Sequence, residues 1–167
     1  MPRICAAAVA VFATLTLAVP ARADAPQVAA SSCVPVSGPY TALANRVSFK
    51  TGKTGTIVLN CQMSEAELAE ADIDGLSMVA TYRDSGGAAA TGQVKILLIG
   101  VAKGLGNKTT TLQFNSNTAP PDSGVTAAVG QVVPVITTDF YYLMRVELKR
   151  ASTDQTVELY GFSYEST

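Results

Sequence analysis

The stretch FYYLMRVELKR, Phe140 to Arg150, alternates between two kinds of side chain along its whole length. One face carries Phe140, Tyr142, Met144, Val146 and Leu148. The other face carries Tyr141, Arg145, Glu147 and Lys149, together with Leu143. A period of two residues is typical of a β-strand with one face in the core and the other in water. The stretch therefore predicts a sheet that covers a core on one side.

Similar short runs fill the chain from Arg46 onward, separated by clusters of Gly, Asn, Asp and Pro. The run from Leu76 to Asp84 alternates in the same way, whereas Val94 to Ala102 is apolar on both faces, as in a central strand. Eight short strands predict an all-β fold, a two-sheet antiparallel β-sandwich of jelly-roll or immunoglobulin-like type. We place these strands at residues 46–50, 56–62, 76–84, 93–103, 109–115, 125–137 with a break at Gly130, 140–150 and 156–164.

The last of these runs changes face partway along. Val157 and Leu159 point to one side, whereas Tyr160, Phe162 and Tyr164 point to the other. A β-bulge at Gly161 would reconcile the two groups, because a bulge adds one residue to the pattern.

The first 23 residues have the pattern of a cleaved secretory signal peptide. Arg3 precedes an apolar run from Ile4 to Val19, and the small residues Ala21 and Ala23 follow. The run is shorter than the roughly 20 residues that a membrane-spanning helix needs. We therefore expect a secreted or periplasmic protein with no membrane span after cleavage. An uncleaved anchor and a lipoprotein modified at Cys33 are the alternatives.

Cleavage would leave residues 24–167, enough for one domain with its own core. We interpret residues 24–45 as an irregular N-terminal segment and residues 46–167 as the β-sandwich. Cys33 and Cys61 are the cysteines that remain, and in an oxidising compartment they predict a disulfide that ties the segment down.

Two of the 12 cations lie in the signal, so ten remain against 13 acidic residues. This mild acidity argues against a nucleic-acid partner.

The segment SEAELAEADIDG, residues 64–75, departs from the β pattern. Ser64 and Glu67 form a capping-box pattern, which predicts a short surface helix near residues 65–72. Glu70, Asp72 and Asp74 also occupy the first, third and fifth positions of a calcium-binding loop. The twelfth position holds Thr81 instead of a carboxylate. We favour a solvated acidic turn, with a calcium site as the alternative; no other cofactor is expected.

The segment FKTGKTGTIVLNC, residues 49–61, resembles two active-site motifs. A phosphate-binding loop would need glycine where Val47 stands, and a helix rather than a β run after it. The Lys-Thr-Gly triplet of serine β-lactamases is accompanied by a Ser-x-x-Lys motif, which this chain lacks. We therefore predict a hairpin turn at residues 51–55.

Catalysis is restricted because the chain contains no histidine. Ser-His-Asp and Cys-His arrangements and zinc sites built on imidazole are thereby excluded. Carboxylate chemistry remains, so a small glycan-acting enzyme is one alternative. Its candidate residues are Asp84, Asp122, Asp139, Glu147 and Glu158.

The favoured function is that of a non-catalytic binding or surface module. Tyr141 and Tyr160 are aromatic residues expected to face outward, and with Arg145 they are the predicted contacts for a glycan or protein ligand. Further hydrogen-bonding candidates are Gln113, Asn115 and Asn117.

Assembly into a surface structure is another alternative. The early cysteine pair, the chain length and the alternating tail VELYGFSYEST, residues 157–167, are similar in general build to fimbrial subunits, which assemble by strand donation. That similarity implies a homo-oligomer or a larger polymer. Asn107-Lys108-Thr109 also satisfies the acceptor rule for N-glycosylation.

Overall fold

The structure is a computed structural model that describes residues 27–63, 68, 75–88, 91–118, 122–132, 135–136 and 138–166, without the side chains of residues 122, 123, 165 and 166. The predicted signal peptide, the predicted helix near 65–72 and the calcium-loop residues Glu70, Asp72 and Asp74 lie outside the described residues. No helix among the described residues is long and apolar enough to cross a membrane.

Eleven β-strands occur in the described part of the chain. They are β1 (Gln27–Ala29), β2 (Val34–Ser37), β3 (Tyr40–Leu43), β4 (Arg46–Phe49), β5 (Gly55–Gln62), β6 (Leu76–Asp84), β7 (Gly92–Ala102), β8 (Lys108–Asn115), β9 (Asp122–Val129), β10 (Phe140–Arg150) and β11 (Val157–Ser166). Two short 3-10 helices, η1 (Ala30–Ser32) and η2 (Ser116–Thr118), accompany them. β9 ends directly before Gly130, where a break was predicted, but the described residues 131–132 and 135–136 form no strand, so the predicted continuation to residue 137 is wrong there.

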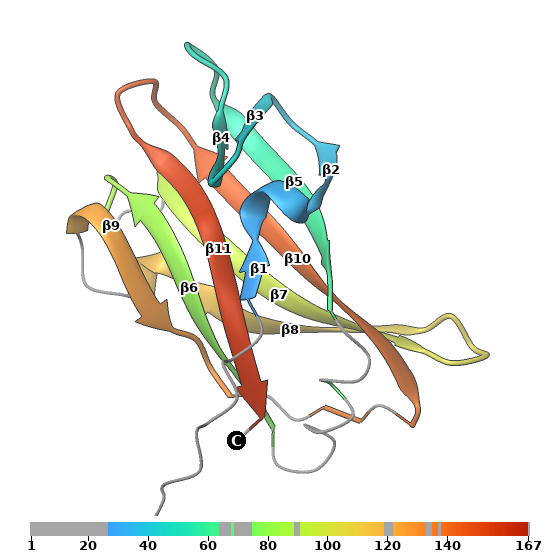
Figure 1. Cartoon of the computed structure of the whole chain (residues 1–167). Coiled ribbons are helices and arrows are strands. Elements are labelled where there is room, and N and C mark those ends of the chain that lie inside the picture. Colours follow the sequence, from blue (N-terminus) through green and yellow to red (C-terminus); the bar gives the residue numbers. More distant parts are fainter. Residues whose placement is uncertain are drawn as a thin grey trace, which may run out of the picture.

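The strands form two antiparallel sheets that pack face to face, which confirms the predicted β-sandwich (Figure 1). Sheet A has the order β3-β4-β11-β6-β9, and β1 also pairs with β11. Sheet B has the order β2-β5-β10-β7-β8.

Residues 24–45, predicted to be irregular, contain three short strands in their described part. Each of these strands pairs with a later one: β1 with β11, β2 with β5, and β3 with β4. For β1 and β2, pairing with strands distant in sequence supplies the order that this segment's own composition does not predict, whereas β3 forms a hairpin with the adjacent β4.

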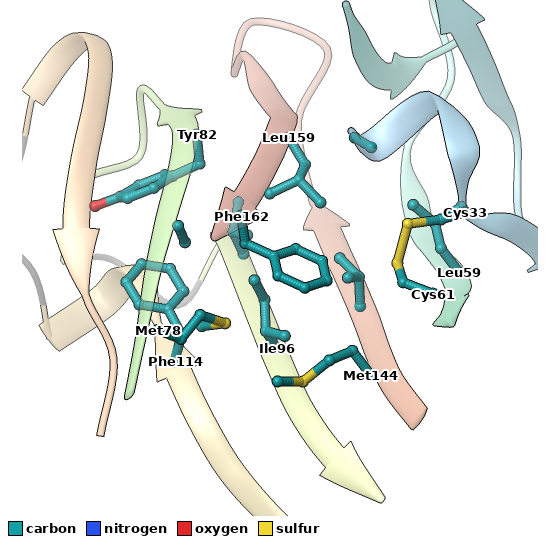
Figure 2. Close-up of a cluster of buried hydrophobic side chains, with 14 of the residues drawn as sticks. Cys33, Leu59, Cys61, Met78, Tyr82, Ile96, Phe114, Met144, Leu159 and Phe162 are labelled. Carbon is teal, nitrogen blue, oxygen red and sulfur yellow. A yellow bond between two sulfur atoms is a disulfide. The ribbon is translucent and has the colours of Figure 1, made fainter. Parts of the chain in front are cut away.

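The core lies between the inner faces of the two sheets (Figure 2). Met144, Val146 and Leu148 of β10 are fully buried, as the alternation of that stretch predicted. The rings of Tyr82 in β6 and Phe114 in β8 lie 5.1 Å apart and connect the two sheets. Phe140 and Tyr142 share the inner face of β10 but are only half-buried.

The bulge predicted at Gly161 is confirmed. The register between β11 and β6 shifts between Leu159 and Gly161, so Tyr160 is the extra residue. Leu159 and Phe162 consequently both face the core, with relative exposures of 0% and 3%. Tyr160 is left half-buried on the outer face of sheet A.

The predicted disulfide between Cys33 and Cys61 is also confirmed, with an S–S distance of 2.03 Å. Cys33 directly precedes β2, and Cys61 lies in β5, the strand with which β2 pairs. The bridge therefore fixes the N-terminal segment to sheet B shortly after β1 has paired with sheet A. A disulfide is consistent with an extracellular location.

Candidate ligand-binding groove

A groove with a volume of about 570 Å³ lies on the outer face of sheet A, where β1 meets β11. Its size is within the range of about 300–1,000 Å³ that is usual for small-molecule sites. The groove is lined by Gln27, Val28, Ala29, Asn45, Thr81, Tyr160, Gly161, Phe162 and Ser163.

The strand pairing explains why a groove forms at this point. β4 pairs with β11 at Glu158 and Leu159, and β1 pairs with β11 at residues 161–163. Two short strands thus share one edge of β11, and the junction between them falls at the bulged residue Tyr160. The groove opens at this junction.

Gly161 allows β1 to approach closely enough to form one wall. A Cβ atom at this position would lie 2.5 Å from the carbonyl oxygen of Val28, closer than real Cβ contacts. Glycine is therefore required for the backbone of β1 to pack directly against β11 here.

The ring of Tyr160 is held by a chain of polar contacts. Its hydroxyl donates a hydrogen bond to Oε2 of Glu158 at 3.0 Å, and Oε1 of Glu158 lies 3.2 Å from Nε of Arg46. Burial raises the pKa of the Tyr160 phenol above its ordinary value of 10.0, and the hydrogen bond to the Glu158 carboxylate raises it further. The phenol is consequently neutral at physiological pH.

Polar residues from several elements line the groove together with Tyr160. Gln27 comes from β1, Asn45 from the turn before β4, Thr81 from β6 and Ser163 from β11. Amide and hydroxyl groups around an aromatic ring are suited to a ligand that carries many hydroxyl groups, because they donate and accept hydrogen bonds without introducing charge.

The predicted ligand contacts Tyr141, Arg145 and Tyr160 do not form a single site. Tyr160 lies on the outer face of sheet A, whereas Tyr141 and Arg145 lie on the outer face of sheet B. Tyr141 is 55% exposed, and Nζ of Lys103 lies 4.9 Å from the centre of its ring. Sequence alternation assigned an outward face to each strand, but it could not tell that these strands belong to different sheets.

Gln113 is not a surface hydrogen-bonding residue. The register between β7 and β8 shifts between Ile96 and Leu97, and this bulge turns the Gln113 side chain into the interior. Its Nε2 donates hydrogen bonds to the carbonyl oxygens of Leu76 and Gln131. It therefore connects elements of the fold instead of facing solvent.

Asn115 and Asn117 lie next to one another at the end of β8. Oδ1 of Asn115 accepts hydrogen bonds from Nε2 of Gln93 at 3.0 Å and from the backbone N–H of Asn117 at 3.1 Å. These contacts give Asn115 a role in the turn that contains η2.

The carboxylates considered for catalysis do not gather at one site, although Asp84 of β6 and Asp122 of β9 are cross-strand partners. Asp84 is buried, where it accepts hydrogen bonds from the backbone N–H of Gly86 at 3.0 Å and from Oγ of Ser116 at 2.7 Å. Glu147 lies on sheet B and Glu158 on sheet A. Asp139 is exposed in the turn before β10, and the side chain of Asp122 is outside the description. The described residues contain no group of three or more His, Cys, Asp or Glu residues that could hold a metal.

Neither a protein-family model nor a curated protein sequence matches the chain. Among solved structures, it is similar to a family 29 carbohydrate-binding module from Piromyces equi, with 9% identity, a TM-score of 0.44 and coverage of 84% of this chain and 85% of the other. It is also similar to the carbohydrate recognition domain of Emp46p in its metal-free form, with 12% identity, a TM-score of 0.39 and coverage of 81% and 88%.

A third similar structure is a family two carbohydrate esterase from Cellvibrio japonicus, with 13% identity and a TM-score of 0.42. The match covers 85% of this chain but only 33% of the esterase chain. Similarities of this extent carry no argument about what the present chain binds.

Proposed function

We propose that this protein is an exported, non-catalytic carbohydrate-binding protein and that the groove beside Tyr160 binds a neutral glycan. The observation that carries the proposal is the presence of Tyr160 in a groove of about 570 Å³ that is also lined by uncharged polar residues from four elements. A sugar has apolar faces that pack on an aromatic ring and hydroxyl groups that need hydrogen-bonding partners.

The polar chain behind the ring supports this proposal. Glu158 accepts a hydrogen bond from the Tyr160 hydroxyl and is itself paired with Arg46. Because of these contacts, the ring is already ordered before a ligand arrives. A preordered ring loses little conformational entropy on binding, which raises affinity. The same contacts occupy the carboxylate of Glu158, which favours a binding role over a catalytic one for this residue.

Binding of neutral oligosaccharides to the protein tests the proposal. A panel of β-glucan, mannan, xylan and galactan oligosaccharides would be screened, and the dissociation constant of any that binds would be measured by isothermal titration calorimetry. Tyr160→Ala should raise this constant at least tenfold, which corresponds to about 1.4 kcal/mol. Tyr160→Phe keeps the ring and should have a smaller effect.

Two further variants keep the test independent of folding. Asn45 is exposed in a turn, so Asn45→Ala should leave the melting temperature unchanged and weaken binding by roughly 3- to 10-fold through one lost hydrogen bond. Tyr141→Ala removes a tyrosine on the other sheet and should not change binding of the neutral sugar. The proposal fails if no neutral glycan binds, or if Tyr160→Ala and Asn45→Ala bind as the unaltered protein does. Hydrolysis of a chromogenic glycoside that is lost in Glu158→Gln would instead indicate an enzyme.

A further inference from the structure

We propose that the outer face of sheet B is a second binding surface, specific for an acidic polysaccharide, and that it acts independently of the groove. This surface, called here the basic face, belongs to sheet B, whereas the groove belongs to sheet A; Figure 1 shows the two sheets packed face to face. The proposal concerns another site and another ligand class, so it does not rest on the proposed function. Its cations are Lys95, Lys103, Lys108, Arg145 and Lys149.

The register of β10 with β7, and of β7 with β8, places these cations on one face. Lys95 is directly opposite Glu147, whose side chain faces outward with that of Arg145. Lys108 is opposite Val101, which is in turn opposite Tyr141. Lys103 lies over the ring of Tyr141 and so belongs to the same end of the face.

The basic face is positive although the chain as a whole is not. The formal net charge of the chain is −1 at pH 7, yet five of its 12 Lys and Arg residues lie on this face. Glu147 is the one acidic side chain on the face among the described strand residues, and its Oε1 lies 3.2 Å from Nε of Arg145. Lys95 and Lys149 have no ion-pair partner within the described part of the chain. An excess of positive charge is therefore available to an anionic ligand.

The arrangement of the cations favours an extended polymer. One group, Lys95 and Lys149, lies toward one end of β10, and the other, Lys103 and Lys108, lies near Tyr141 at the opposite end. The strand distance from the level of Tyr141 to that of Lys149 is roughly 26 Å, at about 3.3 Å per residue. A single small anion could not contact both groups, whereas an extended chain with repeated carboxylates could.

The middle of the face is suited to sugar rings. Leu97 and Leu143 are half-buried there, flanking the nearly buried Ile99, which is directly opposite Leu143. The exposed ring of Tyr141 adds an aromatic surface at one end. The leucines are partly covered by their neighbours, so they form a flat apolar surface on which a ligand can lie. They do not protrude as do the apolar residues that insert into a lipid surface. An acidic polysaccharide uses both the apolar floor and the charged groups.

Polygalacturonate is the probe for this proposal, and the same polymer with its carboxylates reduced to alcohols is its matched control. Affinity electrophoresis and calorimetry on the mature protein should show binding of polygalacturonate that weakens as salt is raised from 20 to 200 mM, because salt screens the ion pairs. The reduced polymer should bind at least tenfold more weakly to the basic face.

Charge variants locate the site. Lys95→Gln with Lys149→Gln should weaken polygalacturonate binding at least tenfold, and Arg145→Gln should weaken it further. Lys50→Gln with Lys53→Gln removes the same charge in the turn that joins β4 of sheet A to β5 of sheet B, where the predicted hairpin does not form, and should have little effect. Tyr160→Ala should leave polygalacturonate binding intact. The substitutions at Lys95 and Lys149 should leave neutral-glycan binding in the groove intact.

The proposal is overturned if polygalacturonate does not bind, if the reduced polymer binds equally well, or if the Lys50 and Lys53 variant loses as much affinity as the Lys95 and Lys149 variant. It is also overturned if single-stranded DNA or phosphatidylserine vesicles bind the same lysines more tightly than polygalacturonate does. Failure of neutral glycans to bind would refute the proposed function and leave this inference standing, since the two experiments use different ligands and different residues.

Discussion

Removal of the Cys33–Cys61 bridge should cost this protein a large part of its stability. The two cysteines are 28 positions apart, so the bridge closes a ring of 29 residues. In the chain-entropy model such a ring removes about 12 cal/mol/K of entropy from the unfolded chain, or roughly 3.6 kcal/mol at 25 °C. Both cysteines are buried, at 6% and 1% exposure, so replacing them with alanine removes core contacts worth about 1 kcal/mol more.

Urea denaturation of the protein measures this loss. Cys33→Ala with Cys61→Ala should lower the free energy of unfolding by about 4–5 kcal/mol and the melting temperature by roughly 10–15 °C. The unaltered protein under a reducing agent is the matched control, because it opens the ring but keeps both sulfur atoms. It should lose about 3.6 kcal/mol. The dependence of stability on urea should also steepen, since the unfolded chain without the bridge is more expanded.

A loss below about 1 kcal/mol in the reduced protein would refute the reasoning. That result would mean that the unfolded chain is already compact around this segment, so that closing the ring removes little entropy. An unchanged urea dependence together with a large loss would instead assign the effect to packing in the folded state.

Three further predictions concern single side chains. Gly161→Ala would place Cβ 2.5 Å from the Val28 carbonyl oxygen and force β1 away from β11. Thermal melting should show that the free energy of unfolding falls by about 1–3 kcal/mol, and neutral-glycan binding should weaken as well. Asp84→Ala leaves the buried Ser116 hydroxyl without its acceptor and should cost about 2–4 kcal/mol in urea, whereas the isosteric Asp84→Asn should cost less. The raised pKa of the Tyr160 phenol means that the folded state holds the phenol proton more tightly than the unfolded chain does. The stabilisation that the protonated phenol provides is therefore complete below pH 10 and is lost as pH rises through the raised pKa. Tyr160→Phe should therefore flatten the stability profile above about pH 10, and identical profiles for the two proteins would contradict this.

Local patterns in the sequence predicted the elements of the fold well. The alternation from Phe140 to Arg150 and from Leu76 to Asp84 correctly identified both faces of β10 and β6, since side-chain direction in a strand depends only on position along it. The bulge at Gly161 was predicted from two groups of residues, Val157 and Leu159 and then Tyr160, Phe162 and Tyr164, that were out of phase. The disulfide followed from a cysteine count, because two cysteines in an oxidising compartment leave a single pairing.

The short strands between residues 27 and 43 could not be predicted in this way. They form because the edges of β11, β5 and β4 are available for pairing, and those edges come from segments later in the chain. The inward position of Gln113 likewise depends on a register shift between β7 and β8, which no local pattern reveals.

At the candidate binding surfaces, local pattern likewise predicted the direction of side chains but not their neighbours. Composition and period identified Tyr141, Arg145 and Tyr160 as outward-facing residues, and all three do face outward. Only the order of strands in the two sheets places Tyr160 in a groove with β1 and puts Tyr141 and Arg145 on the opposite side, among lysines from neighbouring strands. Direction along a strand is a local property with a period of two residues, whereas the neighbours of a side chain across a sheet are set by hydrogen bonds between segments far apart in the chain.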